Sequence, residues 1–208
     1  MDYARSVRLP KLPFVGSATL NDKPAAVANA MAEALGFDIA ARAACRTWEE
    51  ALRHFIAQAD SIGVLVMVSG VVLSNDNRRL DPDEFRGAAL VDRQAPLVFI
   101  NGADSKAAQM FTLAHELAHL WLGSTAVSNA SAAPVGGFRR EEVWCNAVAA
   151  ELLVPLAAIK GDLVADEPVN EAVARLTRRF KVSSLVILRR LLDAGWLRRP
   201  QFDAAWAA

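Results

Sequence analysis

Two of the three histidines in the chain lie four residues apart, in the run His115-Glu116-Leu117-Ala118-His119. The surrounding residues predict a helix, on which side chains four apart project over one patch, with about 40° between their directions and roughly 6 Å of rise. Two imidazoles at that spacing suit a single tetrahedral Zn²⁺. Glu116 directly follows the first histidine, so its carboxylate can reach a metal-bound water without binding the metal. The motif predicts two metal ligands, His115 and His119, and a general base, Glu116.

A catalytic zinc takes three protein ligands, so the third must come from another element. Glu141 and Glu142 stand near the start of the next predicted helix, which runs from residue 139 to about 154. Glu142 is a candidate third ligand, and Asn146, one turn later, could accept the outer N–H of a ligating histidine. Glu141 remains an alternative, and both acids also suit a helix start, where negative charge is favoured. Mn²⁺ or Fe²⁺ fits these ligand types nearly as well as Zn²⁺.

Further contacts to a substrate are harder to find in the sequence. His54 and Arg140 are candidates for an oxyanion donor or substrate contact, although a surface helix histidine and a solvated arginine are simpler interpretations. We expect an extended substrate to add to the strand predicted near residues 96–100. A purely structural zinc site is disfavoured by the open fourth position and by the adjacent Glu116.

The elements that position these residues predict an α+β fold. An irregular N-terminal arm covers residues 1–23, and helices cover 24–36 and 47–59, the second capped by Thr47 with Glu50. Strands at 62–73, 85–91 and 96–100 predict a small three-stranded, mainly antiparallel sheet packed on helices. The motif helix begins after Asp104 or Ser105 and ends before Gly123. Residues 123–137 predict a mobile loop, and helices at 169–180 and 183–194 close the chain.

Composition narrows the class of protein. The chain has 208 residues with a hydrophobic fraction of 53%, enough for a real core. Lys+Arg and Asp+Glu balance at 23 each, so no global charge favours nucleic acid or a membrane. The two cysteines, Cys45 and Cys145, predict reduced buried thiols. The N-terminus lacks the apolar stretch of a signal peptide, and the apolar run at 64–73 is too short to span a bilayer. We therefore expect a cytoplasmic protein without a membrane partner.

Arginines gather near the C-terminus, between residues 175 and 199, where Asp193 is the only acid. The residue order across the last two predicted helices resembles a helix-turn-helix. Three interpretations remain open: a DNA-contacting helix from Ser183 onward, a docking surface for an acidic partner, and a helical subdomain that covers the core with its arginines solvated.

Residues 111–119 (Phe-Thr-Leu-Ala-His-Glu-Leu-Ala-His) and the pattern from Glu142 through Cys145-Asn146 to Pro155 resemble the ImmA/IrrE family of metallo-endopeptidases. The strands at 85–88 and 96–101 also match its layout, and the resemblance covers roughly residues 50–195. It departs from the commoner family pattern at Cys145, where alanine is usual, and at Val148, where phenylalanine is usual. Both changes suggest altered packing, and neither involves a proposed ligand.

This resemblance implies a zincin-like (gluzincin-like) peptidase domain over residues 24–165, followed by a helical subdomain over 166–208. It implies His115, His119 and Glu142 as zinc ligands, which favours Glu142 over Glu141, with Glu116 as catalytic base. Family members typically inactivate a helix-turn-helix repressor, in mobile elements, stress responses or toxin–antitoxin-like pairs. The implied function is cleavage of such a repressor or antitoxin, encoded nearby and supplied in trans. The alternative is a non-hydrolytic, metal-containing regulator that binds a repressor or DNA.

Overall fold

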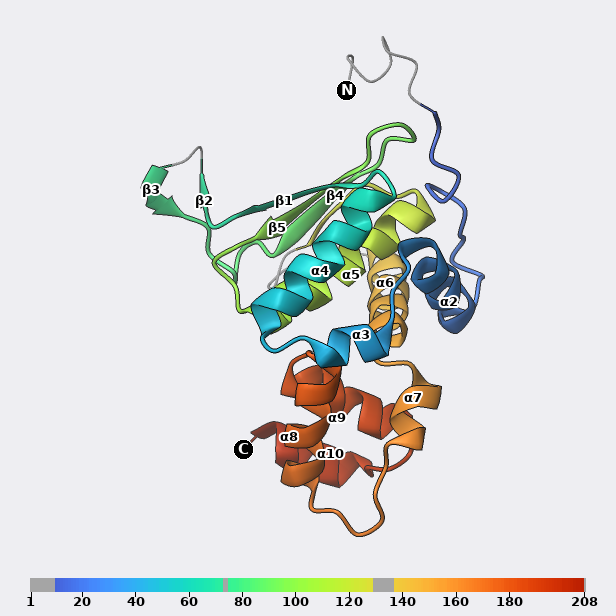
Figure 1. Ribbon diagram of the computed structural model, residues 1–208, viewed down its shortest axis with the longest axis vertical. Coiled ribbons are helices and arrows are strands. Elements are labelled where there is room, and N and C mark those ends of the chain that lie inside the picture. The colour runs from blue at the N-terminus through green and yellow to red at the C-terminus, as the bar shows by residue number, and fades with distance from the viewer. Residues whose placement is uncertain (1–9, 73–74, 129–136, 208) are drawn as a thin grey trace.

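The computed structural model describes residues 10–72, 75–128 and 137–207. Helices lie against a small sheet in the upper part of the molecule, and helices from the C-terminal end form the lower part (Figure 1). The fold is α+β, as predicted. The helices are α2 (Pro24–Leu35), α3 (Ile39–Ala44), α4 (Trp48–Ser61), α5 (Lys106–Leu122), α6 (Gly137–Leu153), α7 (Leu156–Gly161), α8 (Val169–Phe180), α9 (Ser184–Asp193) and α10 (Arg199–Ala207).

The main sheet has four strands in the order β1-β5-β4-β6, not the three that were predicted. Its strands are β1 (Leu65–Ser69), β4 (Gly87–Leu90), β5 (Leu97–Asn101) and β6 (Ala126–Ser128). β5 pairs parallel with β1, while β4 pairs antiparallel with both β5 and β6. A separate antiparallel pair, β2 (Val71–Val72) and β3 (Asn75–Arg79), follows β1. In the main sheet β5 lies between β1 and β4, so β1 has the parallel strand β5 as its neighbour and not the antiparallel partner that a meander would give it.

The additional strand, β6, lies in the segment that was predicted to be a mobile loop. It is only three residues long, too short to show an alternating pattern in the sequence. Residues 129–136 of the predicted loop lie outside the described residues. The strand order also corrects the expected substrate position, because residues 96–100 fall largely in β5, an interior strand with a neighbour on each side. The two edges of the sheet are β1 and β6.

Helix α5 packs against β4 and β5 and carries the predicted metal motif. The buried face of the sheet presents small or branched side chains to it, among them Ala89, Val98 and Ile100. The Ser105 hydroxyl caps the helix by accepting a hydrogen bond from the Ala108 N–H at 3.2 Å. Gly123 ends it in a left-handed conformation with φ 77°. The predicted bounds of this helix are therefore confirmed, with Ser105 rather than Asp104 as its cap.

Residues 10–23 contain no helix or strand, and they pack against the C-terminal end of α5. The Phe14 ring stacks on Trp121 with 4.3 Å between centroids. The Gly16 N–H donates to the Leu120 carbonyl at 3.0 Å, which satisfies one of the unpaired acceptors at the helix end. This part of the predicted arm is thus fixed to the metal-motif helix.

Helix α6 lies across α5 and α2 and ends at two buried arginines. Arg42 of α3 donates to the Leu153 carbonyl, and Arg190 of α9 donates to the Val154 carbonyl at 2.8 Å. Arg42 is 1% exposed and Arg190 is 5% exposed. Cationic side chains at a helix C-terminus satisfy its free carbonyls and complement its dipole. The end of α6 is therefore held from both sides, by the N-terminal helices and by the C-terminal ones.

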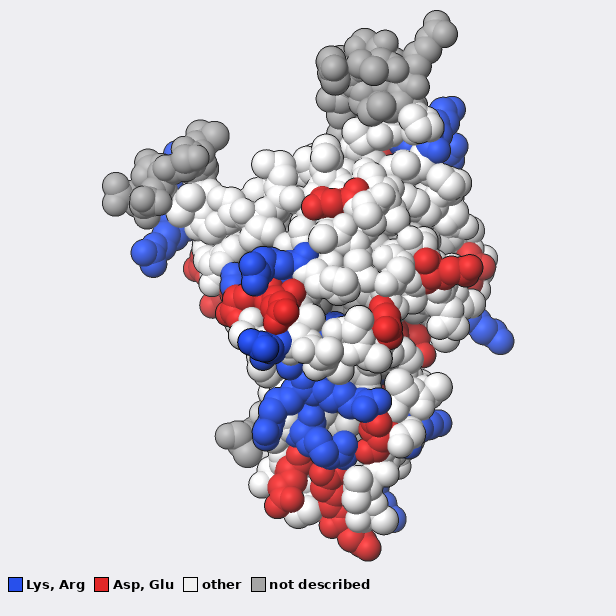
Figure 2. Space-filling view, in the orientation of Figure 1, with Lys and Arg blue, Asp and Glu red and all other residues white. Residues whose placement is uncertain are grey.

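The arginine-rich C-terminal helices pair much of their positive charge internally. Arg175 binds Glu167 at 2.6 Å, Arg179 binds Asp162 at 2.5 Å, and the buried Arg190 binds Glu151. Acidic and basic side chains accordingly lie next to one another over the lower part of the molecule (Figure 2). Helices α8 and α9 meet at a short turn, as predicted, but α7 and α10, which were not predicted, both contact α9. Among the described helices, none is long and apolar enough to cross a membrane.

Candidate metal centre

The two motif histidines point into the interior from the same face of α5. His115 is 5% exposed and His119 is fully buried, and their Nε2 atoms are 3.1 Å apart. The i, i+4 spacing places both rings on one side of the helix. The Nδ1 atom of His119 faces the Ser124 hydroxyl at 3.1 Å. Ser124, just beyond the helix end, thus orients the second ring through its Nδ1 atom.

Glu142 reaches the two rings from α6. Its carboxylate oxygens lie 3.2 Å from His115 Nε2 and 3.3 Å from His119 Nε2. Hydrogen bonds from both histidines hold the pKa of Glu142 well below its usual range. These three side chains form the only group within the described residues whose His, Cys, Asp or Glu atoms are clustered closely enough to hold a metal ion. The structure therefore brings together the two histidines and the acid that the sequence pairs with them.

The spacing of the three donors suits a small divalent ion. Zinc binds histidine nitrogen and carboxylate oxygen at about 2.0–2.2 Å, so neighbouring ligands in a tetrahedron are roughly 3.4 Å apart. The separations of 3.1, 3.2 and 3.3 Å are close to that value. Two imidazoles and one carboxylate also form a donor set typical of catalytic zinc sites. The residues present thus fit a metal ion with an open fourth position.

Glu116 lies beside this cluster without joining it. It is fully buried, and within the described residues neither carboxylate oxygen makes a hydrogen bond of standard geometry, although the Ser128 hydroxyl lies nearby. Burial raises the pKa of Glu116 to about 7, opposed by the nearby Ser128 hydroxyl and His119 and reinforced by Glu142. A buried carboxylate with a pKa near neutrality is suited to accept and return a proton.

Gly87 in β4 allows Glu116 to occupy this position. A Cβ at residue 87 would lie 3.0 Å from Glu116 Oε1 and 2.5 Å from Thr112 Cγ2. Only glycine therefore lets α5 approach the strand this closely. The sequence shows a glycine in a predicted strand, but nothing in it indicates which side chain would come near.

A cleft of about 520 Å³ opens over the metal cluster. His115 and Glu142 form part of its wall, and Ser128 of the edge strand β6 stands at one side. Arg86, directly before β4, also lines the cleft, and its exposed guanidinium is a cationic group that sequence reasoning missed. Two residues of α9, Leu185 and Val186, contribute as well, so a C-terminal helix forms part of the cleft.

Three residues proposed from the sequence do not take the expected positions. Asn146 lines the cleft, but no hydrogen bond joins it to either histidine in the described structure; Ser124 accompanies His119 instead. His54 is exposed on α4, because the opposite face of that helix packs into the core, and it is not among the described residues that line the cleft. Arg140 donates to Asn21 Oδ1 at 3.2 Å, which directs it to the N-terminal segment.

Cys145 and Cys45 are both free thiols. Cys145 is buried on α6, and burial together with the nearby carboxylates raises the pKa of its thiol. A protonated, buried thiol behaves as a small apolar side chain. The departure from the commoner family residue at this position is therefore a matter of packing.

A helix-borne histidine pair, a third donor from a neighbouring helix and a buried glutamate beside them form an arrangement typical of metallohydrolases. Residues 59–192 match the family model of the IrrE N-terminal-like domain, a family of peptidases. This stretch is more than half of the 208 residues, so the chain belongs to that family of metallopeptidases. A comparison with curated proteins found no match.

Proposed function

We propose that the protein is a zinc-dependent endopeptidase that cleaves a partner regulatory protein, a helix-turn-helix repressor or antitoxin. The observation that carries the proposal is the fully buried Glu116, placed beside a cluster of metal donors of which His115 and Glu142 line an open cleft. A protein that only binds a partner has no need of a buried carboxylate at this position. A repressor target would place the reaction in the cytoplasm.

In this proposal His115, His119 and Glu142 hold one Zn²⁺, and Glu116 is the catalytic base. When bound, the ion supplies Lewis acidity, which promotes ionisation of water and polarises a peptide carbonyl. Glu116 takes the proton from the attacking water on a carboxylate oxygen and passes it to the leaving amine nitrogen. Burial supports both steps, because it weakens the preference of this carboxyl group for the ionised form. Ser124 keeps the His119 ring in its orientation through Nδ1.

The cleft also suggests how a peptide would lie. Within the described residues β6 is an edge strand that pairs only with β4, and its Ser128 borders the cleft. An extended substrate can add beside β6 through main-chain hydrogen bonds, which places a peptide bond close to the metal cluster. Arg86, whose backbone N–H donates to the Ser128 carbonyl at 3.0 Å, also lines the cleft, where its side chain is available to contact a substrate carbonyl or carboxylate.

We further propose that residues 24–165 form the peptidase unit and that residues 166–208 form a helical subdomain that completes the cleft. The contribution of α9 to the cleft wall supports this division of roles. The internal ion pairs of Arg175, Arg179 and Arg190 reduce the positive potential that DNA binding needs. We therefore favour a covering role over DNA contact for these helices.

The test uses the Glu116→Gln variant and the helix-turn-helix protein encoded beside this gene. Wild-type protein loaded with Zn²⁺ is expected to cut that protein, and Glu116→Gln to lose the activity while keeping one Zn²⁺ per chain, measured by mass spectrometry of metals. Glu141→Gln, next to the ligand on α6, serves as the matched control and should cut normally. Loading with Mn²⁺ or Fe²⁺ compares the metals directly.

Cleavage by Glu116→Gln at the wild-type rate would contradict the proposed mechanism. If instead Glu116→Gln fully releases the repressor from its operator without cutting it, the non-hydrolytic alternative is correct.

A further inference from the structure

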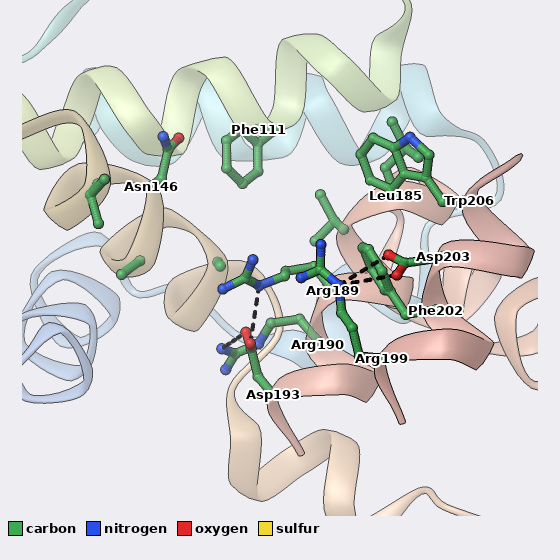
Figure 3. Close-up of a pocket in the computed structure, with 14 residues that line it drawn as sticks. Phe111, Asn146, Leu185, Arg189, Arg190, Asp193, Arg199, Phe202, Asp203 and Trp206 are labelled. Atoms are coloured by element: carbon green, nitrogen blue, oxygen red, sulfur yellow. Dashed lines mark hydrogen bonds and ion pairs between the residues drawn. The ribbon is translucent and has the colours of Figure 1, made fainter. Parts of the chain in front are cut away.

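A second hollow, which the proposed chemistry does not use, lies next to the catalytic cleft. It is a groove of about 730 Å³ bounded by α6, α9 and α10. Figure 3 shows Asn146 at one side of the groove, Leu185 and Trp206 at the other, and Phe111 between them. Phe111, Asn146, Leu185 and Val186 line both the groove and the catalytic cleft, so the two spaces are continuous.

The groove is walled by three helical faces with apolar side chains left open to solvent. Val143 on α6 is 62% exposed, Leu185 on α9 is 46% exposed and Trp206 on α10 is 54% exposed. The α6 face continues through Ala147 and Ala150, whose small side chains let another backbone approach closely. Large apolar side chains that converge in one concavity indicate a binding surface rather than scattered surface residues.

The charged side chains around the groove neutralise one another. Arg189 binds Asp193 at 3.0 Å and Arg199 binds Asp203 at 3.0 Å, as the dashed lines in Figure 3 mark. Arg190 is buried and forms an ion pair with Glu151. Paired charges leave little net potential, so the surface is poorly suited to nucleic acid or to an acidic peptide. A lining of exposed apolar side chains and paired charges favours the binding of an apolar surface.

We propose that the groove binds an amphipathic helix of the substrate protein while the adjoining extended segment of that substrate enters the catalytic cleft. This inference rests on the proposed peptidase function and names a feature of its substrate. Three helical walls and several open apolar anchors match the recognition of one apolar helix face. Binding energy gained at a distance from the cut bond positions that bond and selects the substrate. Substrates of this enzyme therefore carry an apolar helix next to the cleavage site.

The experiment separates docking from cleavage. A fluorescein-labelled amphipathic helical peptide, with leucines spaced i, i+3, i+4 and i+7, is titrated with the full-length Glu116→Gln protein and followed by fluorescence anisotropy. Val143→Asp and Trp206→Ala, each made in that background, are expected to weaken binding at least about tenfold. Val164→Asp is the matched control, because Val164 is 52% exposed outside the groove and should leave the affinity unchanged.

Cleavage of a short quenched peptide that fills only the catalytic cleft provides the second measurement. Otherwise wild-type protein carrying Val143→Asp should keep its zinc content and cut this peptide normally, which shows that the metal site is intact. If the wild type does not cut the short peptide, the peptidase proposal fails, whereas the docking inference is decided by the anisotropy titration alone.

Equal peptide affinity in Val143→Asp and in its parent overturns the docking inference, as does the absence of binding to the parent. It is also overturned if Val143→Asp abolishes binding of duplex DNA, or converts a dimer to a monomer in size-exclusion chromatography. Those results would assign the groove to nucleic acid or to a second copy of the chain.

Discussion

Replacing Gly87 with alanine should lower both the stability of the fold and the activity of the site, because this residue of β4 faces the helix that carries the metal motif. The new Cβ would lie 2.5 Å from Thr112 Cγ2, 3.0 Å from Glu116 Oε1 and 3.0 Å from the Phe99 carbonyl oxygen. Carbon atoms in contact are about 3.5–4.0 Å apart, so the Thr112 side chain, or the turn of α5 that carries it, must move by about 1 Å. The Phe99 carbonyl belongs to the backbone of β5 and cannot rotate away as a side chain can, so β4 itself has little room to retreat from the helix.

Overpacking of this kind costs about 1–3 kcal/mol of unfolding free energy. A displacement of about 1 Å at a catalytic group lowers the rate by about 100-fold. Gly87→Ala is therefore expected to lower the urea midpoint, followed by tryptophan fluorescence, and to lower kcat/KM for a short quenched peptide by about two orders of magnitude. The predicted loss of activity exceeds what partial unfolding alone would give, because the folded fraction stays high.

The control is Gly161→Ala at the end of α7, where nothing lies within 4 Å of the added Cβ. That substitution should be neutral or stabilise the protein by up to about 1 kcal/mol. Wild-type kcat/KM and an unchanged urea midpoint in Gly87→Ala would refute the reasoning, since they would mean that α5 does not approach β4 this closely.

Three further substitutions test the surroundings of the site. Arg190→Ala leaves buried partners unpaired and should lower the free energy of unfolding in urea by about 3–5 kcal/mol. The adjacent, exposed Arg189→Ala should change it by no more than about 1 kcal/mol. Equal effects of the two substitutions would contradict the capping role of Arg190. Ser124→Ala should weaken zinc affinity by about 10–100-fold in chelator competition, because the His119 ring loses its partner. Arg86→Ala should lower kcat/KM at least about tenfold with zinc content unchanged, and a normal value would exclude substrate contact.

The helices could be predicted well because their signals are local. Ser105 and Gly123 mark the two ends of α5 in the sequence, and the Thr47 cap marks the start of α4, where its hydroxyl accepts from the Glu50 N–H at 3.1 Å. The reciprocal bond differs slightly, because Glu50 accepts from the Arg46 N–H at 2.7 Å rather than from Thr47. Short helices such as α3 and α7 have six residues each and too little periodicity to be recognised.

The sheet was predicted less well because strand order is a non-local property. Apolar runs located three of the four strands, but no local pattern distinguishes a parallel neighbour from an antiparallel one. Short connections favoured a meander, but β5 lies between β1 and β4 and pairs parallel with β1. The same error placed the substrate along β5, which turned out to be an interior strand.

The residues of the site show the same difference between local and non-local signals. His115 and His119 share one turn of helix, so their convergence follows from spacing alone. Glu142 required the path of a second helix, and the family pattern supplied what spacing left open. Ser124, Gly87 and Arg86 act through tertiary contacts between segments distant in the sequence, and no motif marks them.

Helix α6 connects the two halves of the proposed mechanism. It carries Glu142 in the metal cluster and Val143 in the groove at consecutive positions, and its last turn is held by Arg42 and Arg190. A rigid helix fixed at its end by two buried guanidinium groups keeps the third donor and the docking surface in constant relation. A substrate helix that packs on α6 would therefore contact the element that completes the metal cluster. Loss of Arg190 should consequently affect zinc retention and substrate docking together, whereas Val143→Asp should affect docking alone.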